Sequence, residues 1–387
     1  MDFDVTAEQK LFVESVTAFG QRYFADGAYA EEEPEGYPHK YLRLLANQGL
    51  TGICLPESHG GLGGSLMDAV LAIEAMAQVA PRAADMIQAT NFGAIQQIAA
   101  YGTEAIQARF LPALLTGERL VSVGMSEPNA GSATTEIATT ATYTDDGVVI
   151  RGGKTFNTNG SHADLWVVWV RFGPGTRGIG CVIVERGTPG LDVNATSRFI
   201  SGEPYAMLSF DDCVIPKDYV MLDHDGFKKL FTVFNIERLG NAARSLAYGE
   251  KALSLSVDYL KERRQFGQRL ADFQGLRWKI ADMKVQLESA KMLLYRAAAD
   301  ADKNGGVPNP AYCSLAKLAC NEAGFFAANE ALQMFGGYGY TAEGPIQYMF
   351  RRTRGWMIAG GTVEIQRNQI ATHLLGKPER PGKETGR

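Results

Sequence analysis

Two segments in the middle of the chain carry residues suited to holding a flat ligand that bears phosphate groups. Residues 125–132, Met-Ser-Glu-Pro-Asn-Ala-Gly-Ser, place hydroxyls and a glycine on a loop shaped by proline, which offers donors to a phosphate or a polar ring edge. Residues 154–160 are Lys-Thr-Phe-Asn-Thr-Asn-Gly. The phenylalanine can stack on a flat ligand ring, and the neighbouring threonine hydroxyls can bond the heteroatoms of that ring. Taken alone, residues 125–132 are more typical of a surface turn, and residues 154–160 are more typical of a β-bulge with Asn-Gly turn chemistry.

Two further segments of this kind lie nearer the end of the chain. Residues 263–267, Arg-Arg-Gln-Phe-Gly, interrupt a helical pattern, and an arginine can contact two oxygens of a pyrophosphate at once, although a solvated basic corner has the same composition. Residues 333–340 and 359–367 contain Gly-Gly pairs, which also occur as plain helix C-caps.

The composition limits the classes of protein to which a chain with these segments can belong. The chain has 387 residues, of which 45% are hydrophobic and 21% charged, as in globular proteins with a large core. A net charge of −5 predicts no nucleic-acid partner, and no apolar run reaches the roughly 18 residues needed to span a bilayer. The acidic start at residues 1–4 is unlike a secretory signal. Five cysteines without a CxxC pair predict a cytoplasmic protein, and five scattered histidines predict no metal site.

The hydrophobic periodicity divides the chain into a helical, a β and a second helical zone. A capping box at Thr6 and Gln9 opens the first zone, whose further helices are predicted at 41–48, 66–79 and 83–117. In the second zone, Asp146-Gly147 between β-type runs predicts a hairpin, and runs at 165–172 and 179–184 predict strands. Because no helix-length segment separates these strands, we expect a β-sandwich or barrel.

The third zone has the lengths of antiparallel bundle helices joined by short loops. Its helices are predicted at 227–260, 273–303, 310–335 and 362–374. The polar end of the chain, 376–387, is expected to fray.

In their order and spacing, the four segments resemble the acyl-CoA dehydrogenase family of flavoproteins, over about residues 3 to 375. The family's [MTV]-[ST]-E-P-x-A-G-S-D run matches residues 125–133, with Ala133 in place of Asp. Its K-x-[FW]-I-T-N-G run matches 154–160, with Asn157 in place of Ile. The runs E-R-x-x-F-G…F-Q and Q-x-x-G-G-x-G-[YF] match 262–274 and 333–340.

The resemblance implies an α+β fold of three domains and a bound FAD. The implied domains are an N-terminal α-helical domain at 1–118, a middle β-sandwich or barrel domain at 119–225 and a C-terminal four-helix-bundle domain at 226–375, followed by a flexible tail at 376–387. Flavin and dinucleotide contacts are implied for Met125, Ser126, Gly131, Ser132, Phe156, Thr158, Thr362 and Glu364. Contacts with a neighbouring subunit's FAD, and hence a homotetramer, are implied for Arg263, Phe266, Phe273, Gln274, Gln333, Gly336 and Gly337.

The resemblance also implies α,β-dehydrogenation of an acyl-CoA, which needs a base on one face of the substrate and a hydride acceptor on the other. The backbone N–H of Gly360 would bond the thioester carbonyl. Most family members place the catalytic Glu directly before Gly-Thr, whereas this chain has Ala359-Gly360-Gly361-Thr362. A branch that includes isovaleryl-CoA dehydrogenase keeps its base in an E-R-L run, which makes Glu237 the predicted base.

Several features surround this prediction. Burial should raise the pKa of Glu237, whereas an ordinary helical surface pair with Arg238 is the alternative interpretation. Asn235 and Arg238 match positions that contact CoA or support the helix, and Ser132 and Gly361 are further expected substrate contacts. The small residues at 359 and 360 favour a branched, cyclic or aromatic acyl group.

Two other functions stay open. The departures at 133, 157 and 360 are compatible with other flavin chemistry, such as that of a desulfinase, an oxidase or a monooxygenase. A non-catalytic subunit of a mixed assembly is the third class, although all four flavin segments are retained. For the dehydrogenase, an electron-transfer flavoprotein is the expected electron acceptor.

Overall fold

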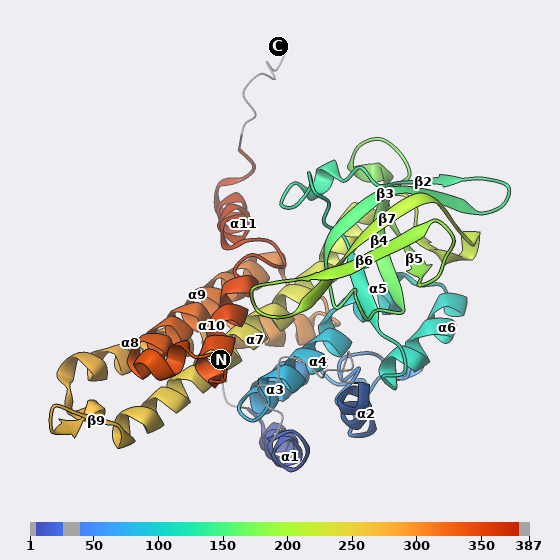
Figure 1. The fold of residues 1–387 in the computed structure, drawn as a ribbon. Helices are drawn as coiled ribbons and strands as arrows, with labels where there is room; N and C mark the ends of the chain where they lie inside the picture. Colours follow the sequence, from blue (N-terminus) through green and yellow to red (C-terminus); the bar gives the residue numbers. More distant parts are fainter. Residues whose placement is uncertain (1–4, 26–38, 379–387) are drawn as a thin grey trace.

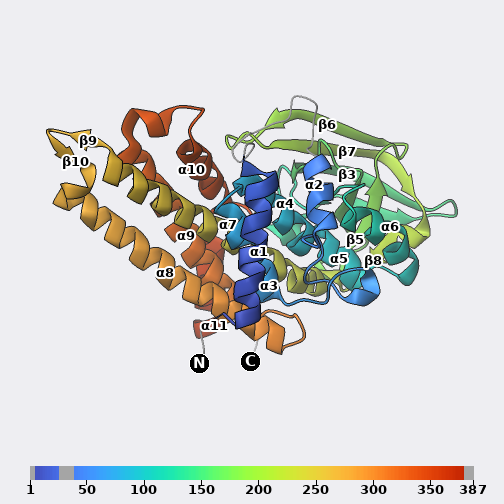
Figure 2. The same cartoon turned by 90° about the horizontal axis from the view of Figure 1, so that it is seen from below.

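The computed structural model describes residues 5–25 and 39–378. The acidic start at 1–4 and residues 379–387 of the predicted tail lie outside the described residues. The chain folds as helices, then a β-sheet, then helices. The N-terminal helices at residues 66–92 lie between the sheet and the C-terminal helices, while those at 94–115 pack on the sheet (Figures 1 and 2). No helix in the described ranges is long and apolar enough to cross a membrane.

The N-terminal helices begin with the predicted capping box, since the Thr6 hydroxyl accepts from the Gln9 N–H and the Gln9 side chain accepts from the Thr6 N–H. The single helical stretch expected at 83–117 is wrong: Gly93 and Gly102 both leave helical geometry, and the Thr103 side chain caps a new helix. The helices are α1 (Ala7–Tyr23), α2 (His39–Asn47), α3 (Leu66–Ala77), α4 (Pro81–Phe92), α5 (Ala94–Tyr101) and α6 (Glu104–Leu115).

The middle segment forms one eight-stranded sheet with the order β6-β7-β3-β2-β4-β5-β8, and β1 pairs in parallel with β4. Its two halves meet at the single pair Thr140↔Arg171 and share one hydrophobic core with residues 94–115. The expected middle β domain is therefore confirmed. The hairpin at Asp146-Gly147 is confirmed between β2 and β3. The strands are β1 (Val121–Gly124), β2 (Thr140–Tyr143), β3 (Val148–Thr158), β4 (Leu165–Arg171), β5 (Ile179–Glu185), β6 (Leu191–Arg198), β7 (Pro204–Ile215) and β8 (Val220–Leu222).

The C-terminal helices include all four that were predicted: α7 (Gly226–Glu262), α8 (Gln274–Lys303), α9 (Pro310–Phe335) and α11 (Val363–Leu375). The sequence prediction missed α10 (Pro345–Trp356), which starts with proline at its first position and packs on α7 and α9. A small hairpin, β9 (Arg264–Gln265) and β10 (Gln268–Arg269), joins α7 to α8. We retain the limits at 118/119 and 225/226 as proposed domain boundaries.

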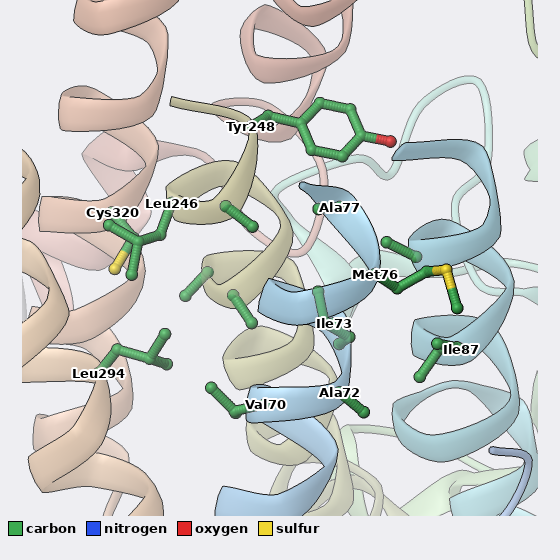
Figure 3. Close-up of a cluster of buried hydrophobic side chains, with 14 of the residues drawn as sticks. Val70, Ala72, Ile73, Met76, Ala77, Ile87, Leu246, Tyr248, Leu294 and Cys320 are labelled. Atoms are coloured by element: carbon green, nitrogen blue, oxygen red, sulfur yellow. The ribbon is translucent and has the colours of Figure 1, made fainter. Parts of the chain in front are cut away.

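The core between the two helical parts is centred on α3. Val70, Ile73 and Met76 of this helix lie among side chains of α4, α7, α8 and α9 (Figure 3). The helices approach closely where glycine permits it, because a Cβ on Gly324 of α9 would lie 2.2 Å from the backbone oxygen of Ser245 on α7. The position of α7 is therefore fixed by packing on several sides.

Candidate active site

The predicted base, Glu237, lies on α7 and faces α4. Its Oε2 accepts a hydrogen bond of 2.9 Å from Nε2 of Gln88 on α4. The two helices come together there because a Cβ on Gly240 would lie 2.6 Å from Cγ of Phe92 and 3.0 Å from Cγ of Gln88. Glu237 is partly buried and bonded inside the protein, so the alternative of an exposed surface pair with Arg238 is wrong.

The surroundings of Glu237 adjust its acidity. Burial raises its pKa to about 7, against the opposing effects of the Arg244 charge, the Gln88 hydrogen bond and the Lys317 charge. The expected rise is confirmed. A carboxyl group with a pKa near neutrality is the kind that proteins use as a general base.

Gly360 lies in a turn that is bonded to α7. Gly360 and Gly361 have φ values of +73° and +87°, a left-handed geometry that favours glycine. Nε of Arg238 donates to the Gly360 carbonyl at 3.2 Å, and its Nη1 donates to Oδ1 of Asn235 at 2.8 Å and to Gln369 at 3.1 Å. Since Arg238 and Asn235 are both buried and bonded to protein groups, their geometry favours the supporting role over direct contact with a substrate.

Gly360 has no side chain, and side chains of α7 and α9 lie close to the position that its Cβ would take. A Cβ on Gly360 would lie 3.2 Å from Cε of Lys317 and 3.8 Å from Nδ2 of Asn241. Burial lowers the pKa of Lys317 to about 7. The place where most of the resembled family carries its glutamate is thus bordered here by a buried lysine and an amide.

The residues expected near a flavin ring gather at one rim of the sheet. The Thr155 N–H donates to the Ser126 carbonyl at 2.8 Å, and the Ser122 hydroxyl donates to the Thr158 carbonyl at 2.8 Å, so the end of β1 lies beside the end of β3. Phe156 sits at a shift in strand register with φ +58°, and its side chain is 57% exposed. This rim presents the Phe156 ring to the outside, and Met125 is half-buried beside the sheet core.

The two departures from the family pattern in this region have different outcomes. Asn157 is buried, and its Nδ2 donates to the Ala206 carbonyl at 2.8 Å, so it ties β3 to β7 where the family has an apolar residue. Nothing in the structure explains Ala133. Gly131 and Ser132 are exposed on the loop after β1.

An ion pair that the sequence interpretation did not single out holds this loop. Nζ of Lys154 donates to Oε1 of Glu127 at 2.6 Å and to the Met125 carbonyl at 3.2 Å. The other acceptors of Glu127 are used by the backbone N–H groups of Ala138 and Thr139. The sequence carried one indication of this ion pair: a glutamate in the first motif segment and a lysine in the second have opposite charges.

The residues expected at a neighbouring subunit lie at the far end of the C-terminal helices. The rings of Tyr259 and Phe335 stack 4.2 Å apart and hold the ends of α7 and α9 together. The 26 residues from Glu237 to Arg263 along α7 correspond to about 39 Å, so the structure does not bring the two sets together within one chain. Exposed members of the far-end set are Arg263, Phe266, Gln274, Gln333, Gly336 and Gly337, while Phe273 is half-buried.

The start of α11 carries the remaining predicted contacts. The Thr362 hydroxyl accepts from the Ile365 N–H at 3.3 Å and caps the helix, and Glu364 is exposed in its first turn.

Sequence reasoning missed Gln88, Asn241 and Lys317 near the base, and the only signal for them is a polar residue within an apolar helical stretch. Among residues 5–25 and 39–378, no group of three or more His, Cys, Asp or Glu side chains could hold a metal ion.

Comparison with protein families and with known proteins covers nearly the whole chain. Models described as the N-terminal, middle and C-terminal domains of acyl-CoA dehydrogenase match residues 6–118, 122–213 and 224–375. An acyl-CoA dehydrogenase of Bacillus subtilis is 33% identical over 377 residues, which span 96% of this chain and 99% of the relative. A 3-sulfinopropanoyl-CoA desulfinase of Paraburkholderia xenovorans is 33% identical over 383 residues, 97% of this chain and 98% of the relative.

Among solved structures, butyryl-CoA dehydrogenase from Megasphaera elsdenii superposes with a TM-score of 0.89 at 33% identity, over 97% of this chain and 100% of that one. The three-domain arrangement expected from the sequence is therefore confirmed.

Proposed function

Because the chain belongs to the acyl-CoA dehydrogenase family, we propose that it is an FAD-dependent enzyme that oxidises an acyl-CoA thioester to the 2-enoyl-CoA, with Glu237 as the base. One observation carries the choice of base: a carboxyl group that is partly buried, bonded to Gln88 and raised in pKa to about 7 lies on α7, while residue 360 has no side chain. The geometry therefore favours the E-R-L placement over the usual one.

The residues present fit FAD. The exposed Phe156 ring at the sheet rim is available for stacking, and the Ser126 backbone is fixed beside it. Gly131, Gly336 and Gly337 have no protein atom within 4 Å of an added Cβ, so the backbone there is open to a ligand. When bound, FAD supplies the acceptor for the hydride that leaves Cβ of the acyl group.

The protein's own part in the reaction is to take a proton and to bind the developing charge. The Glu237 carboxylate accepts the α-proton, and the electron pair of the broken C–H bond moves toward the thioester carbonyl. The Gly360 N–H donates to that carbonyl oxygen, a backbone contact that does not depend on the residue type at this position. Burial around Glu237 excludes water that would otherwise compete for the proton.

The test is Glu237→Gln in the FAD-loaded protein, followed by anaerobic mixing with acyl-CoA esters. General-base catalysis contributes roughly 10²- to 10⁴-fold, so we expect flavin bleaching to slow by about that factor while FAD content stays at the parent level. Asp258→Asn, an exposed carboxylate on the same helix, is the matched control and should bleach like the parent. Bleaching at the parent rate in Glu237→Gln would remove Glu237 as the base.

Desulfinase chemistry is the second candidate, because a relative with that name matches the chain as well as the dehydrogenase does. Only the dehydrogenase requires hydride transfer from an acyl-CoA. Rapid anaerobic bleaching by an unsubstituted acyl-CoA therefore favours the dehydrogenase. Sulfite release from 3-sulfinopropanoyl-CoA without bleaching would favour the desulfinase.

For the acyl group, we infer a branched, cyclic or aromatic chain from the small residues Ala359 and Gly360. The assay is a panel of straight, branched, cyclic and aromatic acyl-CoA esters with a dye or an electron-transfer flavoprotein as acceptor. A kcat/KM that is highest for a straight chain would contradict this inference.

A homotetramer is supported by the far end of the C-terminal helices. Phe266 is 93% exposed, most residues of 336–340 are exposed too, and Phe266 lies beyond the end of α7, too far from Glu237 to serve the same active site. We expect a tetramer by analytical ultracentrifugation, and loss of FAD together with the tetramer in Phe266→Asp. A monomer that retains FAD would contradict the shared site.

All five cysteines are free thiols, which supports a cytoplasmic location, testable by cell fractionation.

A further inference from the structure

Three buried polar side chains form a row behind Gly360. Nζ of Lys317 donates to the Trp356 carbonyl at 3.1 Å and to Oδ1 of Asn321 at 3.0 Å. Nδ2 of Asn321 in turn donates to Oδ1 of Asn241 at 3.0 Å. All three side chains are at most 1% exposed, so the row is closed off from solvent. Such polar groups are costly to bury unless they are bonded, and each of these bonds to the next.

The row fixes which way the Asn241 amide points. Because Nζ of Lys317 donates to the Trp356 carbonyl and to Oδ1 of Asn321, Asn321 turns its Nδ2 toward Asn241. Asn241 therefore accepts through Oδ1, and its two N–H groups point away from the row. Within residues 5–25 and 39–378, Nδ2 of Asn241 donates to no protein acceptor.

The free end of this amide lies next to Gly360. Nδ2 of Asn241 is 3.8 Å from the position of a Cβ on Gly360, an ordinary contact distance from the place where most of the family carries its glutamate side chain. Asn241 is also four residues after Glu237 on α7, which places the two side chains on the same helical face about one turn apart. The base and the amide thus border the same place from one helix.

We propose that Asn241 is a second hydrogen-bond donor to the thioester carbonyl oxygen, beside the Gly360 N–H, and that Lys317 and Asn321 are positioning residues that aim it. The proposal rests on the proposed function. When the α C–H bond breaks, its proton goes to the Glu237 carboxylate and its electron pair forms the enolate, whose oxygen gains negative charge. Nδ2–H of Asn241 keeps its proton and binds this oxygen more strongly than the neutral carbonyl, which lowers the barrier.

The test compares Asn241→Leu and Asn241→Asp, two side chains that branch at the same carbon as asparagine but have no N–H donor. The probe is the acyl-CoA of the panel with the highest kcat/KM in the parent enzyme. Removing one donor of this kind costs about 10²- to 10³-fold in kcat, and we expect that loss with KM changed by less than about threefold. Deuterium uptake from D₂O at the α-carbon, measured by mass spectrometry, should slow by the same factor because it reports proton removal without hydride transfer.

The controls separate this role from a structural one. Ser256→Ala removes a buried hydroxyl of the same helix, bonded only to the Ala252 carbonyl, and should keep the parent kcat. Lys317→Met should lower kcat by at least tenfold with FAD content unchanged, and it provides a second route to the test if both Asn241 variants fold poorly. A kcat within threefold of the parent in the Asn241 and Lys317 variants, or a loss confined to KM, would overturn the proposal.

Failure of the proposed function has a different signature. If the parent enzyme neither oxidises any acyl-CoA of the panel nor exchanges its α-proton, the proposed function falls and Asn241 loses its assigned partner. If the parent is active and Glu237→Gln is inactive, but Asn241→Leu is as active as the parent, only the second donor is refuted.

Discussion

The hydrogen bond from Gln88 to Glu237 should set the acid limit of activity. Only the ionised carboxylate can accept the α-proton, so turnover should rise with pH through the pKa of Glu237, which is about 7. Nε2–H of Gln88 donates to this carboxylate at 2.9 Å and therefore favours its ionised form. Replacing the amide with an apolar side chain, as in Gln88→Leu, removes the donor and should raise the pKa.

The size of the effect follows from the bond. A hydrogen bond to a charged group contributes about 1.5 kcal/mol at the lower end of its range, which corresponds to about one pH unit. With the base at a pKa of about 8 instead of about 7, the ionised fraction at pH 6 falls roughly tenfold, while at pH 9 the two enzymes differ by only about 10%. The assay is kcat/KM as a function of pH between about 5.5 and 9.5, which reports the pKa of the free enzyme, with flavin reduction as the readout.

The matched control makes the same chemical change at Gln78, the residue that ends α3 and contacts another part of α7. Gln78→Leu removes a bond of 3.3 Å from Nε2 to the Ala247 carbonyl, far from the carboxyl group, and should leave the acid limb in place. An acid limb in Gln88→Leu that coincides with that of the parent would refute the reasoning, as would an equal loss of kcat/KM at pH 6 and pH 9.

Two further substitutions test the position of the base and the packing that holds it. Gly360→Glu in the Glu237→Gln enzyme should restore less than about 1% of the lost turnover, because position 360 has φ +73° and its Cβ would lie 3.2 Å from Cε of Lys317. Asp85→Ala should lower the free energy of unfolding by about 3–5 kcal/mol, because it leaves the fully buried Arg352 without one of its carboxylates. Chemical denaturation measures this loss.

A specific result would contradict each of these two predictions. Recovery of a tenth or more of the parent rate in the double variant would mean that the backbone at 360 accommodates a working base. For the buried pair, Asp272→Ala removes a surface carboxylate bonded to Arg269 and should cost no more than about 1 kcal/mol. A similar loss in both variants would argue against a special contribution from the buried pair.

The elements that could be predicted are those with local signals. The capping box at Thr6 and the hairpin at Asp146-Gly147 each depend on a few neighbouring residues, and both form as expected. Helix α10 was missed because Gly and Pro flank it and three arginines interrupt its apolar pattern. The stretch at 83–117 reads as continuous in its hydrophobic period, although two glycines break it into three helices.

The candidate site divides in the same way. Glu237 could be named because its motif carries the information in three adjacent residues. Gln88 could not, because its bond to Glu237 joins residues 149 positions apart, and no periodicity reports which side chains meet across two helices. Likewise, the apolar run around Lys317 indicates a buried helix, but only the fold reveals that its ammonium group lies behind Gly360.

Because α7 is long, the same small tilt of this helix would move its far end much more than it would move Glu237. The 37 residues of this helix correspond to about 55 Å, and its first residue, Gly226, is wedged against the Ile179 carbonyl of the sheet. A tilt of one degree about that anchor would carry the far tip through about 1 Å, but Glu237, only about 17 Å from the anchor, through about 0.3 Å. Because Glu237 lies near this anchor, any small tilt of the helix about it moves the proton-accepting group only about a third as far as the outer end.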